Sequence, residues 1–130
     1  MTEQRSIWVT FSKEGVHRYP GADTDPKLAT GDWDDVSFLG YPHRHIFHFR
    51  VYIQVEHNDR DVEFILFKRD VQKYIDNMAE DQKNKSCEMI SDALNNAIVK
   101  DYPGRKVIIE VGEDNENGSR KEYDGPVDYN

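Results

Sequence analysis

The sequence predicts an α+β domain in which a four-stranded antiparallel sheet carries two antiparallel helices on one face. Two observations predict this class. Apolar residues alternate with period two near both ends of the chain, and between these segments they recur with helical spacing. The expected order of elements is ββααββ. At 130 residues we expect one domain over residues 1–125, followed by a flexible tail at 126–130.

Alternation predicts the first two strands. Residues 6–12 alternate, and Gly15 is expected to end that strand. Residues 20–36, rich in Asp, Gly, Pro and Thr, are expected to form a long loop. Residues 43–55 form the second strand. Its odd positions make one face, apolar apart from the two leading histidines: His43, His45, Phe47, Phe49, Val51, Ile53 and Val55.

Helical spacing predicts two helices in the middle of the chain. Residues 62–66 form a short apolar run that we expect to pair back as a strand before the first helix begins. The stripe of that helix consists of Phe67, Val71, Tyr74, Ile75 and Met78. Ser86 is expected to cap the second helix, with Glu88 in its first turn. The predicted buried stripe of the second helix consists of Met89, Ile90, Ala93, Leu94, Ala97 and Ile98.

Alternation and one turn motif predict the closing pair of strands. Residues 106–111 alternate, and Glu113 follows at the end of this strand. Asn117-Gly118 is a strong signal for a β-hairpin turn. Residues 119–123 would then return along the sheet as its edge strand.

Composition limits the class of function. The net charge of −8 argues against nucleic acid as the main partner, because phosphate binding depends on Lys and Arg. No apolar run approaches the length of a membrane span, so we expect no membrane partner. The single cysteine, Cys87, fits a reducing compartment. We therefore expect a cytoplasmic protein, either bacterial or encoded by an infecting phage.

Two histidines at the start of the second strand suggest a metal site. His43 and His45 are two residues apart, so on a strand they would point the same way and can share one metal ion. A third ligand would have to come from elsewhere in the chain. The alternative is that both are ordinary histidines, hydrogen-bonded or half exposed at a strand start. The spacing alone leaves both interpretations open.

Five short segments, taken in order, resemble one known family. They are Phe11 with His17-Arg18, His43-Arg44-His45-Ile46-Phe47, residues 62–68, Ser86-Cys87-Glu88-Met89 and residues 107–114. They are similar to conserved segments of the 6-pyruvoyltetrahydropterin synthase and 6-carboxytetrahydropterin synthase family: its early Phe…His-Arg element, its His-Gly-His-Asn-Tyr segment, the openings of its two helices and its closing Val-x-Val-x-Glu-Thr strand. This family has the T-fold, and the likeness covers nearly the whole chain.

The resemblance implies a zinc site and a pocket for a heterocycle. His17, His43 and His45 would hold zinc and leave one coordination position for the hydroxyls of a substrate. Glu113 would bind the ring N–H and exocyclic amine of a pterin or purine. Arg44 stands where the family has a glycine; it is a candidate for binding the phosphates of a ligand, and the alternative is a solvated charge on the face of the sheet. The alternative for Glu113 is an ordinary carboxylate at a strand end. Because the family closes its sheets into rings, we also expect a homo-oligomer with sites between subunits.

The chain departs from the family at its catalytic positions. The cysteine that precedes the family's His-x-His pair is missing from residues 38–41, and so is the Asp-His pair between the two helices. Cys87 opens the second helix instead, where a small buried side chain is expected. An enzyme of this type would need a different base, and Asp34, Asp35 and Tyr41 are the candidates.

Three functions remain open on these grounds. The first is a zinc-dependent enzyme of the tetrahydropterin synthase type that acts on a dihydropterin triphosphate. The second is a catalytically degenerate T-fold that binds a purine-like nucleotide without turnover, for example a phage protein that removes a nucleotide signal of its host. The third is a structural T-fold oligomer with neither ligand. The missing thiol favours the second, and the retained histidines support the first.

Overall fold

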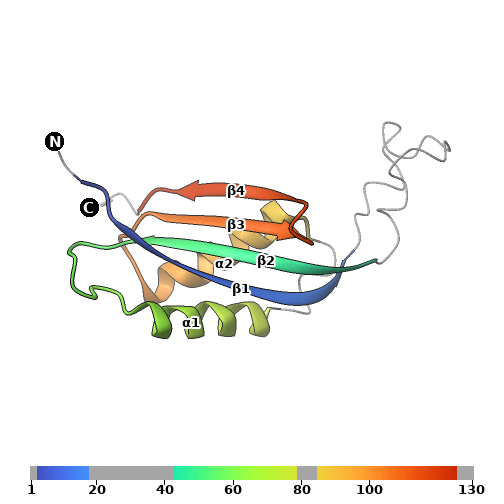
Figure 1. Cartoon of the computed structure of the whole chain (residues 1–130), viewed down its shortest axis with the longest axis horizontal. Coiled ribbons are helices and arrows are strands. Elements are labelled where there is room, and N and C mark those ends of the chain that lie inside the picture. Colours follow the sequence, from blue (N-terminus) through green and yellow to red (C-terminus); the bar gives the residue numbers. More distant parts are fainter. Residues whose placement is uncertain (1–2, 18–42, 79–84, 126–130) are drawn as a thin grey trace.

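The computed structural model describes residues 3–17, 43–78 and 85–125, with side chains at all of these positions except 16, 17, 43 and 44. It confirms the predicted ββααββ order, and the sheet is antiparallel with strand order β1-β2-β3-β4 (Figure 1). The elements are β1 (Ser6–His17), β2 (His43–Gln54), α1 (Phe64–Asn77), α2 (Cys87–Asp101), β3 (Val107–Glu113) and β4 (Asn117–Tyr123). Among the described residues, neither helix is long and apolar enough to cross a bilayer.

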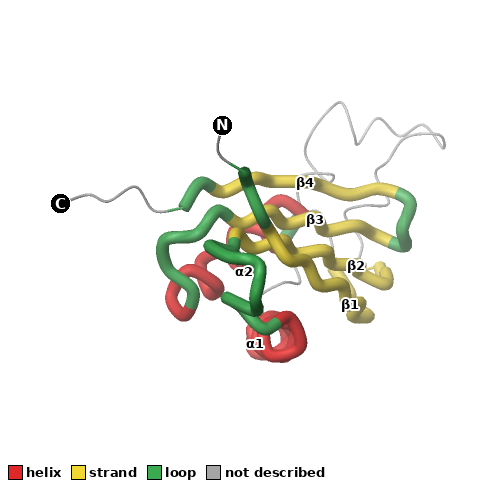
Figure 2. Tube along the Cα trace, turned by 60° about the vertical axis from the view of Figure 1, so that its left-hand side comes forward, coloured by secondary structure: helices red, strands yellow, loops and turns green. Residues whose placement is uncertain are grey.

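Both helices lie on the same side of the sheet, as Figure 2 shows. The core fills the space between these two layers, because alternate strand residues and one stripe of each helix are buried there. The strands contribute Val9, Phe47, Phe49, Val51, Ile53, Val107, Ile109 and Val111, and the helices contribute Phe67, Val71, Ile75, Cys87, Ile90, Leu94 and Ile98. The predicted apolar face of β2 is therefore confirmed wherever its side chains are described.

The first strand extends further than the sequence predicted. We expected it to end at Ser12, with Gly15 as the break, but β1 continues to His17 and stays paired with β2. Gly15 fits within the strand because the ring of Phe47 occupies the space of its missing side chain: an added Cβ would lie 2.9 Å from a Phe47 ring carbon. The glycine therefore accommodates an aromatic side chain from the neighbouring strand instead of ending the pairing.

The expected short strand at residues 62–66 is wrong, because α1 already begins at Phe64. The side chain of Glu63 caps this helix and accepts a hydrogen bond from the backbone N–H of Ile65 at 2.9 Å. Phe64, Ile65 and Leu66 are each 55% exposed, so this apolar run is not a buried strand. The apolar composition of residues 62–66 suggested a strand, but the cap formed by Glu63 favours a helix.

The second helix is capped as predicted, since Ser86 accepts a hydrogen bond from the backbone N–H of Met89 at 3.2 Å. Its buried stripe is shifted from the predicted one, however. Met89 is 54% exposed, whereas Ser91 is fully buried and its hydroxyl lies 2.8 Å from that of Tyr123 on β4. This hydrogen bond satisfies a polar group that would otherwise be costly to bury.

The hairpin between β3 and β4 is confirmed, but its turn lies earlier than predicted. The turn consists of residues 114–116, and Asp114 and Asn115 have positive φ values of 56° and 59°. Asn and Asp adopt this left-handed conformation more readily than other residues that carry a side chain. Asn117 and Gly118 belong to β4, and Gly118 is required there by close approach: an added Cβ would lie 2.3 Å from the carbonyl oxygen of Val111.

Two glycines that face each other in this hairpin provide a matched test. Gly112 pairs with Gly118, but an added Cβ on Gly112 would meet nothing closer than 3.4 Å. We expect Gly118→Ala to lower the free energy of unfolding by about 1–3 kcal/mol through overpacking. Gly112→Ala should be neutral or stabilising by up to about 1 kcal/mol. Urea denaturation measures both, and equal effects of the two substitutions would contradict the close approach at Gly118.

Candidate functional site

Polar side chains gather at the end of the sheet where β2 begins and β3 ends, on the right in Figure 1. The register pairs Phe47 of β2 with Glu113 of β3, so His45 lies just beyond the last pair of these two strands. The first residue of α2, Cys87, reaches the same place, and its thiol lies 3.8 Å from a Glu113 carboxylate oxygen. Three elements distant in sequence therefore supply one cluster.

His45 lies between two carboxylates. Its Nδ1 is 2.6 Å from Oδ2 of Asp114, and its Nε2 is 3.6 Å from Oε2 of Glu113. The side chains of His45 and Glu113 are 20% and 24% exposed, so both are largely buried, and Nε2 of His45 itself is shielded from solvent. The His45 ring also packs edge-to-face against Phe47, with ring centroids 6.2 Å apart.

Cys87 is a neutral thiol in this environment. Burial raises its pKa to about 12, and the nearby carboxylate of Glu113 adds to this effect. The thiol donates a hydrogen bond to Oε1 of Glu113, which favours the protonated form further. The predicted role of Cys87 as a small buried side chain is confirmed, and its high pKa makes it a poor nucleophile near neutral pH.

Asp114 is an ionised partner of His45. The hydrogen bond from His45 holds the pKa of this carboxyl below its usual range, and a second bond from the backbone N–H of Ile46 acts in the same direction. Sequence reasoning did not single out Asp114. The tight turn after β3 contains it, but only the register with β2 shows that this turn lies against His45.

The other predicted metal ligands occupy neighbouring backbone positions. His17 and His43 are paired across β1 and β2, and position 43 is two residues before His45 on the same strand. Their side chains lie outside the described residues, as does that of Arg44, whose backbone pairs with Val16. The catalytic candidates at positions 34, 35 and 41 and the tail at 126–130 also lie outside the described residues.

One feature of the described part of the site favours binding of a cation: the pair formed by His45 and Glu113. Among the residues whose side chains are described, no three His, Cys, Asp or Glu side chains are arranged so that they could together hold a metal ion. His45 and Glu113 nevertheless bring a ring nitrogen and a carboxylate oxygen within 3.6 Å of each other. When the His45 ring is neutral and its Nδ1–H donates to Asp114, Nε2 of His45 and Oε2 of Glu113 are both hydrogen-bond acceptors. Such a pair attracts a cation, either a proton or a metal ion.

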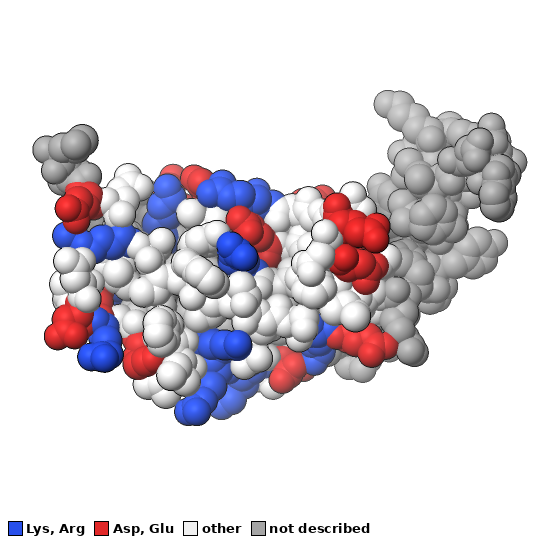
Figure 3. Space-filling view, viewed as in Figure 1, with Lys and Arg blue, Asp and Glu red and all other residues white. Residues whose placement is uncertain are grey.

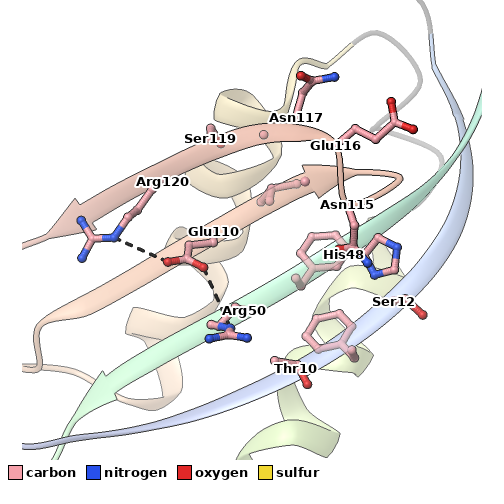
Figure 4. Close-up of a pocket in the computed structure, with 15 residues that line it drawn as sticks. Thr10, Ser12, His48, Arg50, Glu110, Asn115, Glu116, Asn117, Ser119 and Arg120 are labelled. Carbon is pink, nitrogen blue, oxygen red and sulfur yellow. Dashed lines mark ion pairs between the residues drawn. The ribbon is translucent and has the colours of Figure 1, made fainter.

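The opposite face of the sheet carries a second polar region. A groove of about 690 Å³ is lined by residues of all four strands, among them Gly112 and Gly118. Figure 4 shows the polar side chains that line it. His48 lines this groove and therefore lies on the face opposite to the helices. The alternation of β2 already separated His48 from His45, and Gly112 and Gly118, which also line the groove, face each other across β3 and β4.

Three charged side chains of the groove, Arg50, Glu110 and Arg120, are paired with one another. Glu110 lies between Arg50 and Arg120, with N···O distances of 4.0 and 3.5 Å (Figure 4). Arg50 also lies over the ring of Trp8, 5.0 Å from its centroid. Figure 3 shows acidic and basic side chains interspersed over the visible surface. Arg50 therefore belongs to a network of charges on this face of the sheet.

Comparisons with known proteins do not assign a family. The chain matches none of the protein-family models, and no curated protein matches it.

The neutral thiol of Cys87 can be tested by alkylation. At pH 9 a thiol with a pKa of about 12 is ionised in roughly one molecule per thousand, so native Cys87 should react very slowly with iodoacetamide. The same thiol in guanidinium should react several hundred times faster, since an ordinary cysteine has a pKa of about 8.5. Mass spectrometry follows both reactions. Equal rates in the folded and unfolded protein would show that Cys87 is not protected.

Proposed function

We propose that this protein is a divergent member of the 6-pyruvoyltetrahydropterin and 6-carboxytetrahydropterin synthase family, with a three-histidine zinc site and a pterin or purine pocket anchored by Glu113. The observation that carries this proposal is the meeting of His45 and Glu113, which the β2–β3 register brings together from distant parts of the chain. The ββααββ order and the pairing of position 17 with position 43 support the same conclusion.

Each residue has a distinct task in this proposal. His17, His43 and His45 hold zinc, which supplies a positive charge that lowers the pKa of ligand hydroxyls. Glu113 accepts two hydrogen bonds from the ring N–H and exocyclic amine of the heterocycle, a bidentate contact of the charge-assisted kind. Its partial exposure leaves the carboxylate accessible to such a ring. Arg44 is the candidate for binding the ligand's phosphates.

A second candidate function is binding without turnover, and the state of Cys87 favours it. The thiol is buried and protonated, so it cannot replace the proton-abstracting cysteine that the family places before its His-x-His pair. A chain with the pocket but without a base would capture a purine-like nucleotide and retain it. In a phage this activity would remove a nucleotide signal of the host. If turnover does occur, Asp34, Asp35 and Tyr41 remain the candidate bases.

The proposal includes assembly into a homo-oligomeric ring in the cytoplasm, with neither nucleic acid nor membrane as a partner. Among the described residues, the two outer strands of the sheet, β1 and β4, each pair with a single neighbour. Such edges present backbone donors and acceptors that a second subunit can satisfy. A ring built through these edges would place Arg44 near a subunit boundary, where it can serve the pocket of either subunit.

Metal analysis tests the zinc site. Protein purified without a chelator or a His-tag should contain about one zinc per chain, and His45→Ala should lose it because one of three ligands is removed. His48→Ala is the matched control: it also removes one imidazole of β2, but from the opposite face of the sheet, so zinc should be retained. Plasma mass spectrometry gives the ratios. Equal loss in both variants, or no zinc in the wild type, would refute the site.

Ligand-induced stabilisation tests the pocket. A dihydropterin triphosphate or a guanine nucleotide that binds the folded state should raise the melting temperature, by the equivalent of about 2.7 kcal/mol when its concentration is a hundred times Kd. Glu113→Gln should abolish the shift because the neutral amide cannot accept both hydrogen bonds as a carboxylate does. Chromatography of the same mixtures separates turnover from simple binding. A shift that persists in Glu113→Gln would place the ligand elsewhere.

A further inference from the structure

Asp114 is fixed against His45 by three hydrogen bonds. Its Oδ2 lies 2.6 Å from Nδ1 of His45, and its Oδ1 accepts from the backbone N–H of Ile46 at 2.9 Å. Its own backbone N–H donates to the carbonyl oxygen of Ile46 at 2.8 Å. Both carboxylate oxygens and the main chain of Asp114 are therefore held by two consecutive residues of β2, which leaves the carboxylate little freedom to turn away.

The geometry of the turn makes this contact possible. Strand β3 ends at Glu113, and the chain enters the left-handed conformation at Asp114, where φ is 56°. In a continuing strand, Asp114 would point to the face opposite Glu113. The turn instead brings consecutive carboxylates to the two ring nitrogens of His45: Asp114 to Nδ1 and Glu113 to Nε2.

The short contact determines which nitrogen of a neutral His45 carries the proton. A carboxylate ionised near neutral pH can only accept hydrogen bonds, so an imidazole nitrogen 2.6 Å away must be the donor. The opposite tautomer would place a ring lone pair against a carboxylate oxygen at that distance, which is strongly unfavourable. The lone pair of the neutral ring therefore belongs to Nε2, on the side of Glu113.

We propose that Asp114 is a positioning residue that fixes His45 in the Nδ1–H tautomer and so presents its Nε2 as a ligand for a divalent metal ion. This inference rests on the zinc site of the proposed function, and it adds a residue that neither the sequence pattern nor the family resemblance indicated. Carboxylates that hold the second nitrogen of a metal-binding histidine fix its orientation and increase its basicity. Asp114 stands in that relation to His45.

Nitrogen NMR of the metal-free protein tests the tautomer directly. Long-range proton–nitrogen correlations of a 15N-labelled sample at pH 8 should assign the proton of His45 to Nδ1 in the wild type. In Asp114→Asn the side chain can instead donate its amide N–H to Nδ1, so the Nε2–H tautomer should appear. Glu116→Gln is the matched control, because it removes one carboxylate from the same turn without a contact to His45, and its spectrum should match the wild type.

Zinc affinity provides the second measurement. Competition with a chromophoric chelator should show a loss of roughly 10–100-fold in Asp114→Asn and no change in Glu116→Gln. A wild-type His45 that carries its proton on Nε2 overturns the inference, and this measurement requires no variant to fold. An unchanged tautomer in Asp114→Asn also overturns it. If His45 is the Nδ1–H tautomer but no zinc binds, Asp114 orients the ring as inferred and the zinc site of the proposed function is refuted.

Discussion

Pairing of β2 with β3 is the constraint on which the candidate site depends. A shift of one residue in this register would turn every side chain of one strand to the other face and separate His45 from Glu113. Buried apolar pairs prevent that shift: Phe49 opposite Val111, Val51 opposite Ile109 and Ile53 opposite Val107. The position of the polar cluster is thus set by the hydrophobic core and not by the polar groups themselves.

The polar groups lie where the core ends, and this placement limits the cost of burying them. Ionised side chains in an apolar interior are strongly destabilising unless they are paired. His45 and Glu113 keep part of their surface in contact with solvent, and Glu113 accepts from the thiol of Cys87 beside the start of α2. The amino-terminal end of a helix carries a partial positive charge that favours a nearby carboxylate. A cluster of ionisable side chains is therefore compatible with a stable fold at this edge.

Features that follow from periodicity along the chain, such as the buried face of a strand, could be predicted from the sequence. Contacts that depend on the register between distant strands could not. Alternation in β2 identified its buried face, and the cap at Ser86 fixed the start of α2. The run at residues 62–66 was misassigned because its composition suits a strand, while the cap formed by Glu63 selects a helix. The role of Asp114 depends on a turn that folds back onto a strand distant in sequence, and no local pattern contains that information.

The position of Asp114 in the β3–β4 turn also determines when the site can form during folding. The β3–β4 hairpin joins neighbouring segments and can close early, whereas β2 meets β3 only after a loop that contains both helices has closed. Glu113 and Asp114 therefore have no His45 beside them until this slow, long-range pairing is made. A partly folded chain has no site, so any ligand bound there stabilises the completed domain alone. A ligand that bound at this site would therefore raise the free energy of unfolding, and more so at higher ligand concentration.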